Sequence, residues 1–348
     1  MDGSLTPPLH FPVATPPGAG ETLRIAPGVE WVRMPLPFAL DHINLWLLED
    51  GAGWAIVDTG YAMAETTGRW ERIFAERLNG SPVTRIIATH HHPDHIGLAG
   101  WLAERWQVPL WTTEKEWLFA RVLTRSADDS AELRRGFARR AGLDEAASEL
   151  FAEHHQGYRR GVPAVPSSFQ RLADGQVIEI GGREWRVIVG EGHSPELACL
   201  YCAETGVLIS GDQVLPKISP NVSVQAHEPD SDPLSRFLHS LDTLRGAVPP
   251  ETLVLPSHNL PFIGLHTRIE ALVAHHRARC AEIIAACGHP QNAMQLLPVL
   301  FRRPLDRHQM AFALGEALAH LHYLTGQGAL TRVLGSDGVN RFIRSVGK

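Results

Sequence analysis

Runs of apolar residues with the periods of strands and helices cover most of the chain from Val29 onward. In the first half, three strand-like runs follow one another through tight turns, and short buried strands then alternate with the helical runs Ala62–Leu78 and Ile96–Trp106. The strands expected here are Val29–Pro35, Ile43–Glu49, Trp54–Val57, Arg85–Thr89 and Leu110–Thr112. The pattern therefore predicts a β-meander followed by a β-α-β-α-β stretch.

The second half of the chain repeats this order. Strand-like runs come first, and helix Pro233–Arg245 and strand Thr252–Leu255 follow them. The earlier strands are expected at Val177–Ile180, Trp185–Val189, Ala198–Cys202 and Val207–Ser210. Two similar halves predict an α+β protein in which two sheets pack face to face with helices outside, a four-layer αββα sandwich.

Three further segments depart from this pattern. A Pro/Gly-rich opening predicts a flexible arm over residues 1–20, and a helical, Arg-rich stretch over about 114–168 predicts an insertion into a core domain at 21–265. Beyond Leu265 three helical runs and an Asp-Gly turn predict a C-terminal domain at 266–348 that coarsely resembles a winged helix. The helices are expected at His266–Ala286, Ala293–Phe301 and Arg307–Thr325.

Composition narrows the class of protein. The 348 residues are 44% hydrophobic and carry a formal net charge of −6, which argues against a surface built as a whole for nucleic acid or anionic membrane. No run reaches the about 18 apolar residues of a membrane span, and the start does not resemble a signal peptide. With only 4 cysteines, the chain is expected to be a cytoplasmic protein without a disulfide framework. The Cys199-x-x-Cys202 pair is expected to fill the core.

The strongest chemical signal is the run from Thr89 to His95, Thr-His-His-His-Pro-Asp-His, at the end of an apolar strand. Strand alternation would place His90 and His92 on one side, while Asp94 and His95 would lie in the turn into the next helix. Three imidazoles and a carboxylate within six residues form a ligand set of zinc or iron type. The run therefore predicts an open, catalytic metal site.

Four motifs together resemble one family. The run His90-x-His92-x-Asp94-His95 is followed by Gly192-His193-Ser194-Pro195, Ser210-Gly211-Asp212 and Pro256-Ser257-His258-Asn259. In content and order these motifs resemble the metallo-β-lactamase-fold hydrolases, over roughly Val29 to Leu265. The resemblance implies an αββα fold with its ligands at the ends of strands.

The resemblance also implies a role for each motif residue. His90, His92 and His193 would hold a first metal ion, and Asp94, His95 and His258 a second. Asp212 would bridge both ions, and Asp58 would orient a ligand histidine from beneath. Asp94, Asp212 and Asp58 are thus the carboxylates expected in the catalytic machinery. Two divalent ions are implied, with Zn favoured and Fe or Mn as alternatives.

The activity implied is hydrolysis of an ester, thioester or lactone carbonyl by a metal-bridging hydroxide. Asp212 at the bridging position argues against antibiotic hydrolysis, and the loss of a second Gly-His after His193 argues against a glutathione thioester. His92 also excludes the flavodiiron branch, which needs a Glu there. A small acyl compound is the expected substrate.

Two other activities stay open on the sequence. A phosphodiesterase or ribonuclease would use the same ions and grip phosphates with the Arg-rich insertion and the basic C-terminal domain. A mononuclear iron enzyme of the persulfide-dioxygenase kind would need only His90, His193 and Asp212. An aspartic protease is excluded, because Asp58-Thr59-Gly60 has no second counterpart in the chain.

Further contacts are expected at the mouth of the site and in the tail. Tyr158, Arg159 and Lys217 are candidates for substrate contact, because the insertion and the loop after Asp212 would border the metals. The other histidines, His91 and His42 among them, are expected in surface or packing roles. The C-terminal domain is expected to serve as an assembly or lid element rather than as a nucleic-acid reader, and a homodimer is compatible with this.

Overall fold

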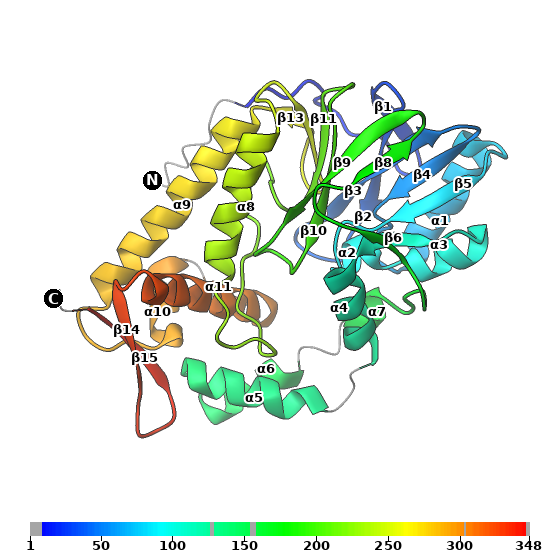
Figure 1. The fold of residues 1–348 in the computed structure, drawn as a ribbon. Coiled ribbons are helices and arrows are strands. Elements are labelled where there is room, and N and C mark those ends of the chain that lie inside the picture. Colours follow the sequence, from blue (N-terminus) through cyan, green and yellow to red (C-terminus); the bar gives the residue numbers. More distant parts are fainter. Residues whose placement is uncertain (1–8, 126–128, 154–157, 303, 346–348) are drawn as a thin grey trace. The chain divides into compact units, whose positions relative to one another are not determined.

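The computed structural model of the chain describes residues 9–125, 129–153, 158–302 and 304–345. Its strands form two mixed sheets and a separate hairpin (Figure 1). The first sheet is antiparallel from β1 to β4 and parallel from β4 to β7. Its strands are β1 (Thr22–Ala26), β2 (Val29–Pro35), β3 (His42–Asp50), β4 (Gly53–Val57), β5 (Val83–Ile87), β6 (Leu110–Thr113) and β7 (Gln170–Leu172).

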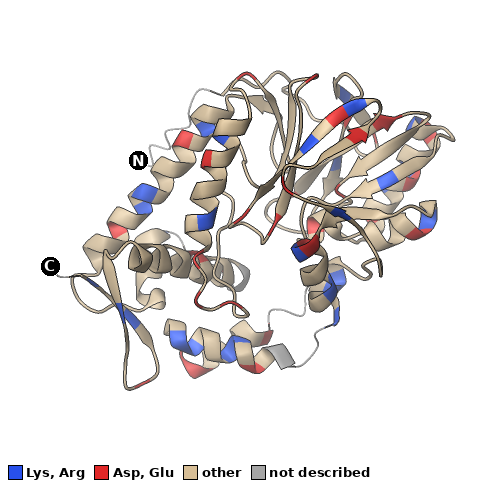
Figure 2. Cartoon of the chain, viewed as in Figure 1, with Lys and Arg blue, Asp and Glu red and all other residues tan. Residues whose placement is uncertain are grey.

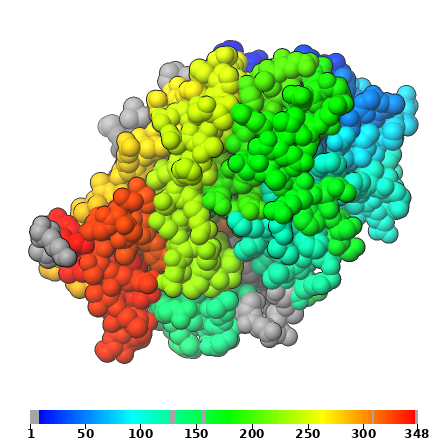
Figure 3. Space-filling view, viewed as in Figure 1, coloured from blue at the N-terminus to red at the C-terminus, as the bar shows by residue number. Residues whose placement is uncertain are grey.

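The second sheet has the order β13-β12-β11-β10-β9-β8, and its only parallel neighbours in the described chain are β11 and β12. Its strands are β8 (Val177–Ile180), β9 (Arg183–Gly190), β10 (Leu197–Cys202), β11 (Val207–Gly211), β12 (Leu253–Pro256) and β13 (Phe262–Ile263). The hairpin pairs β14 (Leu330–Leu334) with β15 (Asn340–Arg344). The outer part of this hairpin, red in Figure 3, is exposed, and Leu334 keeps 64% of its surface.

Helices flank both sheets and make up most of the C-terminal part (Figure 1). Helix α1 continues into a π-helical turn, η1. The helices are α1 (Ala64–Ile73), η1 (Phe74–Leu78), α2 (Pro93–Ile96), α3 (Ala99–Trp106), α4 (Glu114–Arg125), α5 (Asp129–Ala141), α6 (Glu145–Glu153), α7 (Tyr158–Gly161), α8 (Pro233–Ala247), α9 (Leu265–Ala286), α10 (Ala293–Leu300) and α11 (Arg307–Gly326).

Strand β3 shows how the layers are held together, because both of its faces are buried. On one face, Trp46 belongs to an apolar cluster shared with Leu200 of the second sheet. On the other face, Leu45 belongs to a cluster shared with Trp70 of α1. Side chains alternate along a strand, so one strand contributes to both the sheet-to-sheet core and the sheet-to-helix core.

The predicted α+β fold with two sheets, flanking helices and a small helical C-terminal domain is confirmed. The strand before the histidine run differs from the prediction, since β5 ends at Ile87 and residues 88–92 lie in a loop. The expected strand Arg85–Thr89 is therefore wrong at its end, and strand alternation does not bring His90 and His92 together. The winged-helix character of the C-terminal domain stays a prediction.

The chain divides into two compact units. The first comprises Met1–Arg125, Gly157–Pro220 and Leu241–Ile269 and contains both sheets. The second comprises Ser126–Gln156, Asn221–Ser240 and Glu270–Lys348. The domain ranges expected from the sequence, 1–20, 21–265 and 266–348, stay a prediction.

The second unit is assembled from separated segments of the chain. Gly142 follows α5 at φ +100°, and a Cβ there would lie 2.4 Å from the side chain of Asn292, the N-cap of α10. The loop before α8 also joins it, since the Val224 amide donates to the carbonyl of Gly315 in α11 at 3.1 Å. Among the described helices, none has the length and apolar character needed to cross a membrane.

Candidate metal centre

The histidine and aspartate motifs all follow the carboxyl ends of strands. Asp58 comes directly after β4, and the loop from Thr89 leads from β5 into α2. In the second sheet, His193 follows β9, Asp212 follows β11 and His258 follows β12. Parallel neighbours such as β4 and β5, or β11 and β12, end at the same edge of their sheet. The fold therefore collects these side chains in one place.

A first group of possible ligand atoms comes from His90, His92, His193 and Asp212, which all lie within 4.8 Å of one another. The Nε2 atom of His90 is 2.9 Å from Nδ1 of His92 and 3.3 Å from Nε2 of His193. The carboxylate of Asp212 completes the group, with Oδ2 at 3.5 Å from Nε2 of His193. Three ring nitrogens and one carboxylate oxygen thus converge.

A second group comes from Asp94, His95 and His258. Oδ2 of Asp94 lies 3.4 Å from Nε2 of His258 and 3.6 Å from Nε2 of His95. Asp212 lies between the two groups, because its oxygens are also 3.4 Å from Nε2 of His258 and 3.6 Å from Nε2 of His95. One carboxylate therefore reaches nitrogens of both groups.

Two buried atoms show that these groups fit metal ions. Nε2 of His95 and Oδ1 of Asp212 are both buried and have no hydrogen-bond partner in the described chain. A buried polar atom without a partner is costly, and a bound cation would supply the missing partner. Imidazole nitrogens and carboxylate oxygens are ligands for divalent ions of zinc type.

The charge states agree with ligand chemistry in the first group. Burial and the neighbouring imidazoles hold the pKa values of His90 and His92 well below the usual range, so both rings are neutral and keep a free lone pair. Although burial opposes it, nearby His258 and His95 hold the pKa of Asp212 well below its usual range. Neutral imidazoles and an ionised carboxylate are the forms that bind metal.

The second group carries more negative charge around its histidines. Burial lowers the pKa of His258, but the carboxylates of Asp212 and Asp94 outweigh that effect and raise it to about 10. In His95, Asp58, Asp94 and Asp212 likewise overcome burial and raise the pKa. These carboxylates make the pocket attractive to any cation, and a divalent ion can replace the proton on each ring.

In His90, His95 and His258, the ring nitrogen that faces away from the centre contacts a polar group of the protein. Nδ1 of His95 donates to Oδ2 of Asp58 at 2.8 Å, and Nδ1 of His258 donates to the carbonyl of His42 at 2.8 Å. Nδ1 of His90 lies 3.1 Å from the hydroxyl of Thr89. Such contacts fix the tautomer and the orientation of a ligand ring, leaving Nε2 to face the centre in all three residues.

The role of His42 was missed at the sequence level. Its side chain accepts a hydrogen bond from the Asn259 amide at 2.9 Å, and its carbonyl accepts the one from His258. Because β3 and the β12 loop are about two hundred residues apart along the chain, no local pattern indicates the contact.

The candidates for substrate contact lie in different environments. Tyr158 is largely buried, and its hydroxyl donates to the carbonyl of His91 at 2.6 Å, so its phenol braces the histidine loop. Arg159 in α7 and Lys217 after β11 are exposed. Their contact with a substrate stays a prediction.

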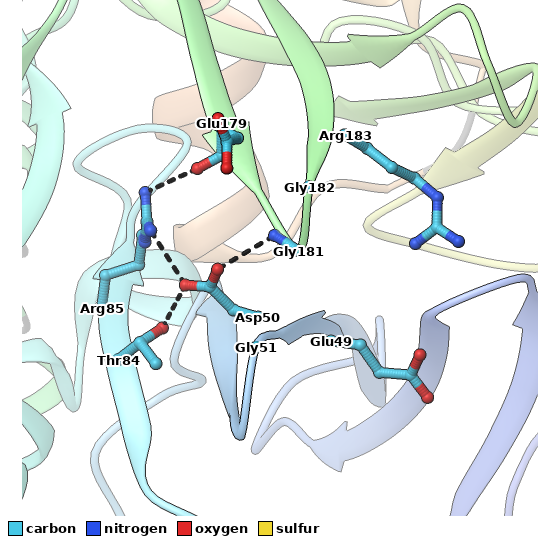
Figure 4. Close-up of a pocket in the computed structure, with 9 residues that line it drawn as sticks. All are labelled: Glu49, Asp50, Gly51, Thr84, Arg85, Glu179, Gly181, Gly182 and Arg183. Carbon is cyan, nitrogen blue, oxygen red and sulfur yellow. Dashed lines mark hydrogen bonds and ion pairs between the residues drawn. The ribbon is translucent and has the colours of Figure 1, made fainter.

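A separate hollow of about 530 Å³ lies at the opposite end of β4 and β5, where the β3–β4 and β8–β9 turns meet (Figure 4). Asp50 lies at its centre and accepts hydrogen bonds from Thr84, Arg85 and the Gly181 amide. Arg85 also donates to the carbonyl of Glu179, so Arg85, paired with Asp50, connects the two sheets.

Comparison with known families gives two matches. Residues 39–258 match the family model described as the metallo-beta-lactamase superfamily. Residues 280–345 match the model described as the metallo-beta-lactamase-like C-terminal domain.

Three individual proteins illustrate the similarity. A crystal structure of a beta-lactamase domain protein from Burkholderia ambifaria is 49% identical, covers 97% of this chain and 98% of its own, and superposes with a TM-score of 0.89. "Probable metallo-hydrolase YqjP" from Bacillus subtilis is 23% identical over 307 residues, 86% of this chain and 93% of its own. "Acyl-coenzyme A thioesterase MBLAC2" from Bos taurus is 26% identical over 199 residues, 54% of this chain and 63% of its own.

Proposed function

The chain belongs to the metallo-β-lactamase superfamily, and on that premise we propose that it is a binuclear hydrolase of ester, thioester or lactone carbonyls. It is a metallo-hydrolase with two His/Asp ligand groups. That its substrate is an ester, thioester or lactone is what we propose. The similarity of this chain to a protein named as an acyl-coenzyme A thioesterase supports this substrate class.

The observation that carries the proposal is the position of Asp212. Its two oxygens lie 3.4 to 3.6 Å from ring nitrogens of His258, His95 and His193, which belong to both groups. A carboxylate so placed can serve two ions at once. His90, His92 and His193 would hold the first ion, and Asp94, His95 and His258 the second.

When bound, two divalent ions supply a water that ionises near neutral pH and a positive charge for the carbonyl oxygen. The chain's own residues fix the ligands. Asp58, Thr89 and the His42 carbonyl hold the rings of His95, His90 and His258 in orientation, so the site is built before substrate arrives. Burial of His90 and His95 at 0% exposure keeps bulk water away from these nitrogens. We propose Zn as the metal, with Fe or Mn as alternatives.

The substrate would approach from the exposed rim of the site. Arg159 and Lys217 are exposed cations on α7 and on the loop after β11, and both would suit a negatively charged part of an acyl compound. Tyr158 would act by bracing the histidine loop through its bond to His91.

Two observations argue against a mononuclear iron enzyme and against a phosphodiesterase or ribonuclease. A mononuclear enzyme would leave Asp94, His95 and His258 without use, although they converge as a second group. A nuclease would need free cations, but Arg135 and Arg139 of α5 pair with glutamates of the same unit, and Figure 2 shows both basic and acidic residues on this helix. These paired arginines offer little to a phosphate backbone.

The test is a substrate panel on protein whose metal content has been measured. Acyl-coenzyme A thioesters of increasing length, chromogenic esters and lactones are compared with a phosphodiester, using wild type and Asp212→Asn. We expect a carbonyl substrate to be hydrolysed at least about tenfold faster than the phosphodiester, in a reaction that Asp212→Asn abolishes. Faster turnover of the phosphodiester would overturn the substrate class.

A further inference from the structure

Glu116 is a completely buried carboxylate in the first turn of α4, outside every motif that marks the metal centre. It forms no ion pair with a Lys or Arg in the described chain. In the described chain, its hydrogen-bond partners are His91, Ser194 and Glu196, which lie in the two segments that carry the ligand candidates His90, His92 and His193.

The two carboxylate oxygens of Glu116 contact different loops. Oε2 accepts a hydrogen bond from the amide of His91 at 2.9 Å and lies 2.5 Å from its Nδ1. Oε1 accepts bonds from the hydroxyl of Ser194 and the amide of Glu196, both at 2.7 Å. One side chain thus links a loop of the first sheet with a loop of the second.

The linked residues are direct neighbours of the ligand candidates. His91 lies between His90 and His92, and Ser194 follows His193. One buried carboxylate therefore fixes residues adjacent to three of the four ligand candidates in the first group. The second group is held differently, because His95 and His258 are oriented by Asp58 and His42.

We propose that Glu116 is a positioning residue that sets the geometry, and hence the affinity, of the first metal site but not of the second. The inference rests on the proposed metal centre and is independent of the proposed substrate. Carboxylates behind metal ligands typically change metal affinity by about 10- to 100-fold. Glu116 differs from such partners because it contacts the residues next to the ligand candidates, by backbone and side chain, rather than a ligand ring.

Replacement by glutamine separates this role from simple filling of space. Glu116→Gln keeps the volume but has a single acceptor oxygen, so it can serve the Ser194 loop or the His91 loop, not both. Its amide group would then face another N–H group. The variant should loosen one loop relative to the other while the apolar core of the unit is unchanged.

The experiment measures metal dissociation constants for each site alone, by competition with a chromogenic zinc chelator. His258→Ala disables the second group and reports the first, and His193→Ala disables the first and reports the second. Glu116→Gln is placed in each background, and Glu114→Gln serves as the matched control. Glu114 lies in the same helix but is 47% exposed and pairs with Arg171 on the surface.

We expect Glu116→Gln to weaken zinc binding about 10- to 100-fold in the His258→Ala background and to leave it unchanged in the His193→Ala background. Glu114→Gln should change neither. Equal weakening in both backgrounds would mean general destabilisation, and no weakening in either would mean that Glu116 does not position the site. Both results overturn the inference. If the single variants of His258 and His193 bind no zinc and wild type binds none either, the proposed function itself fails instead.

A milder variant keeps the test usable if Glu116→Gln does not fold. Ser194→Ala removes one of the bonds to Oε1 and leaves the others. It should weaken the first site by about 2- to 10-fold, the value of one hydrogen bond, with the same selectivity. A loss of the same size at the second site would contradict the proposal.

Discussion

The Oδ2 atom of Asp58 lies 2.8 Å from Nδ1 of His95, and both side chains are buried. Asp58 also accepts a hydrogen bond from the Thr89 amide at 2.7 Å, and its own backbone has a positive φ of 62°. A non-glycine residue in that conformation is strained, so the surrounding contacts must hold it there. Asp58 therefore links the end of β4 to the histidine loop.

Replacing Asp58 should weaken the second metal site. Asp58→Asn can still accept from the Thr89 amide but removes the charge behind His95, so we expect metal affinity at this site to fall about 10- to 100-fold. Zinc titration with a competing chelator measures it. Asp242→Asn, which changes an exposed carboxylate, is the control. Two ions bound as tightly as in wild type would contradict the assigned role.

Asp212→Asn should abolish most activity without unfolding the protein. The change keeps size and removes the charge shared by both groups, so we expect kcat/KM to fall about 100-fold or more. Circular dichroism and kinetics on the same preparation separate folding from catalysis. Wild-type turnover in this variant would show that Asp212 does not serve both ions.

Metal content should be about two ions per chain, because the two ligand groups each supply at least three side chains. Elemental analysis of protein purified without chelator measures this number. Removing the metal should abolish activity, and adding Zn should restore it. A stable value near one, unchanged in His258→Ala, would favour the mononuclear alternative.

The second unit should lose stability in mild acid. Burial lowers the pKa of His276 to about 2 and that of His320 to about 4, and these rings contact each other at 3.1 Å. The unfolded chain takes up these protons near pH 6.5, whereas the folded chain does not. The stability they contribute is therefore present above pH 6.5 and lost as pH falls toward 4.

Glu316 has the opposite effect on the pH dependence of stability. Burial raises its pKa to about 7, so the folded chain keeps a proton that the unfolded chain releases above about pH 4.5. As pH falls from 6.5 to 4.5, the two histidines and this glutamate together should lower the free energy of unfolding by about 1.4 kcal/mol per pH unit. Glu316→Gln removes the opposing effect, and urea unfolding at pH 7, 6 and 5 should show about twice that slope. An unchanged slope would contradict this account.

Deleting residues 266–348 should leave an insoluble or self-associating product. The remaining part of the second unit would expose Phe237, which is fully buried and lies 5.6 Å from the ring of His276. Size-exclusion chromatography with light scattering compares the truncated and intact chains. A monodisperse truncated protein would mean that residues 1–265 fold without the C-terminal segment.

The sequence by itself determined most of the strands, most of the helices and the ligand motifs, although it gave no sign of β1, β7 or β13. Period-two and period-3.6 patterns are local, so strands such as Val29–Pro35 are recognised without any knowledge of their neighbours. The spacing of His90, His92, Asp94 and His95 is equally local, and the order of the four motifs identified the family, which the comparisons confirmed.

The tertiary structure decided what lies behind these ligands. A loop, not strand alternation, brings His90 and His92 together, because β5 already ends at Ile87. Glu116 and His42 act on residues 25 to 217 positions away in the chain, and only the packing of the two sheets makes those contacts. A local pattern cannot indicate contacts between residues so far apart in the chain. Bringing such segments together costs chain entropy, and burial of the whole apolar core compensates for that cost, not any single motif.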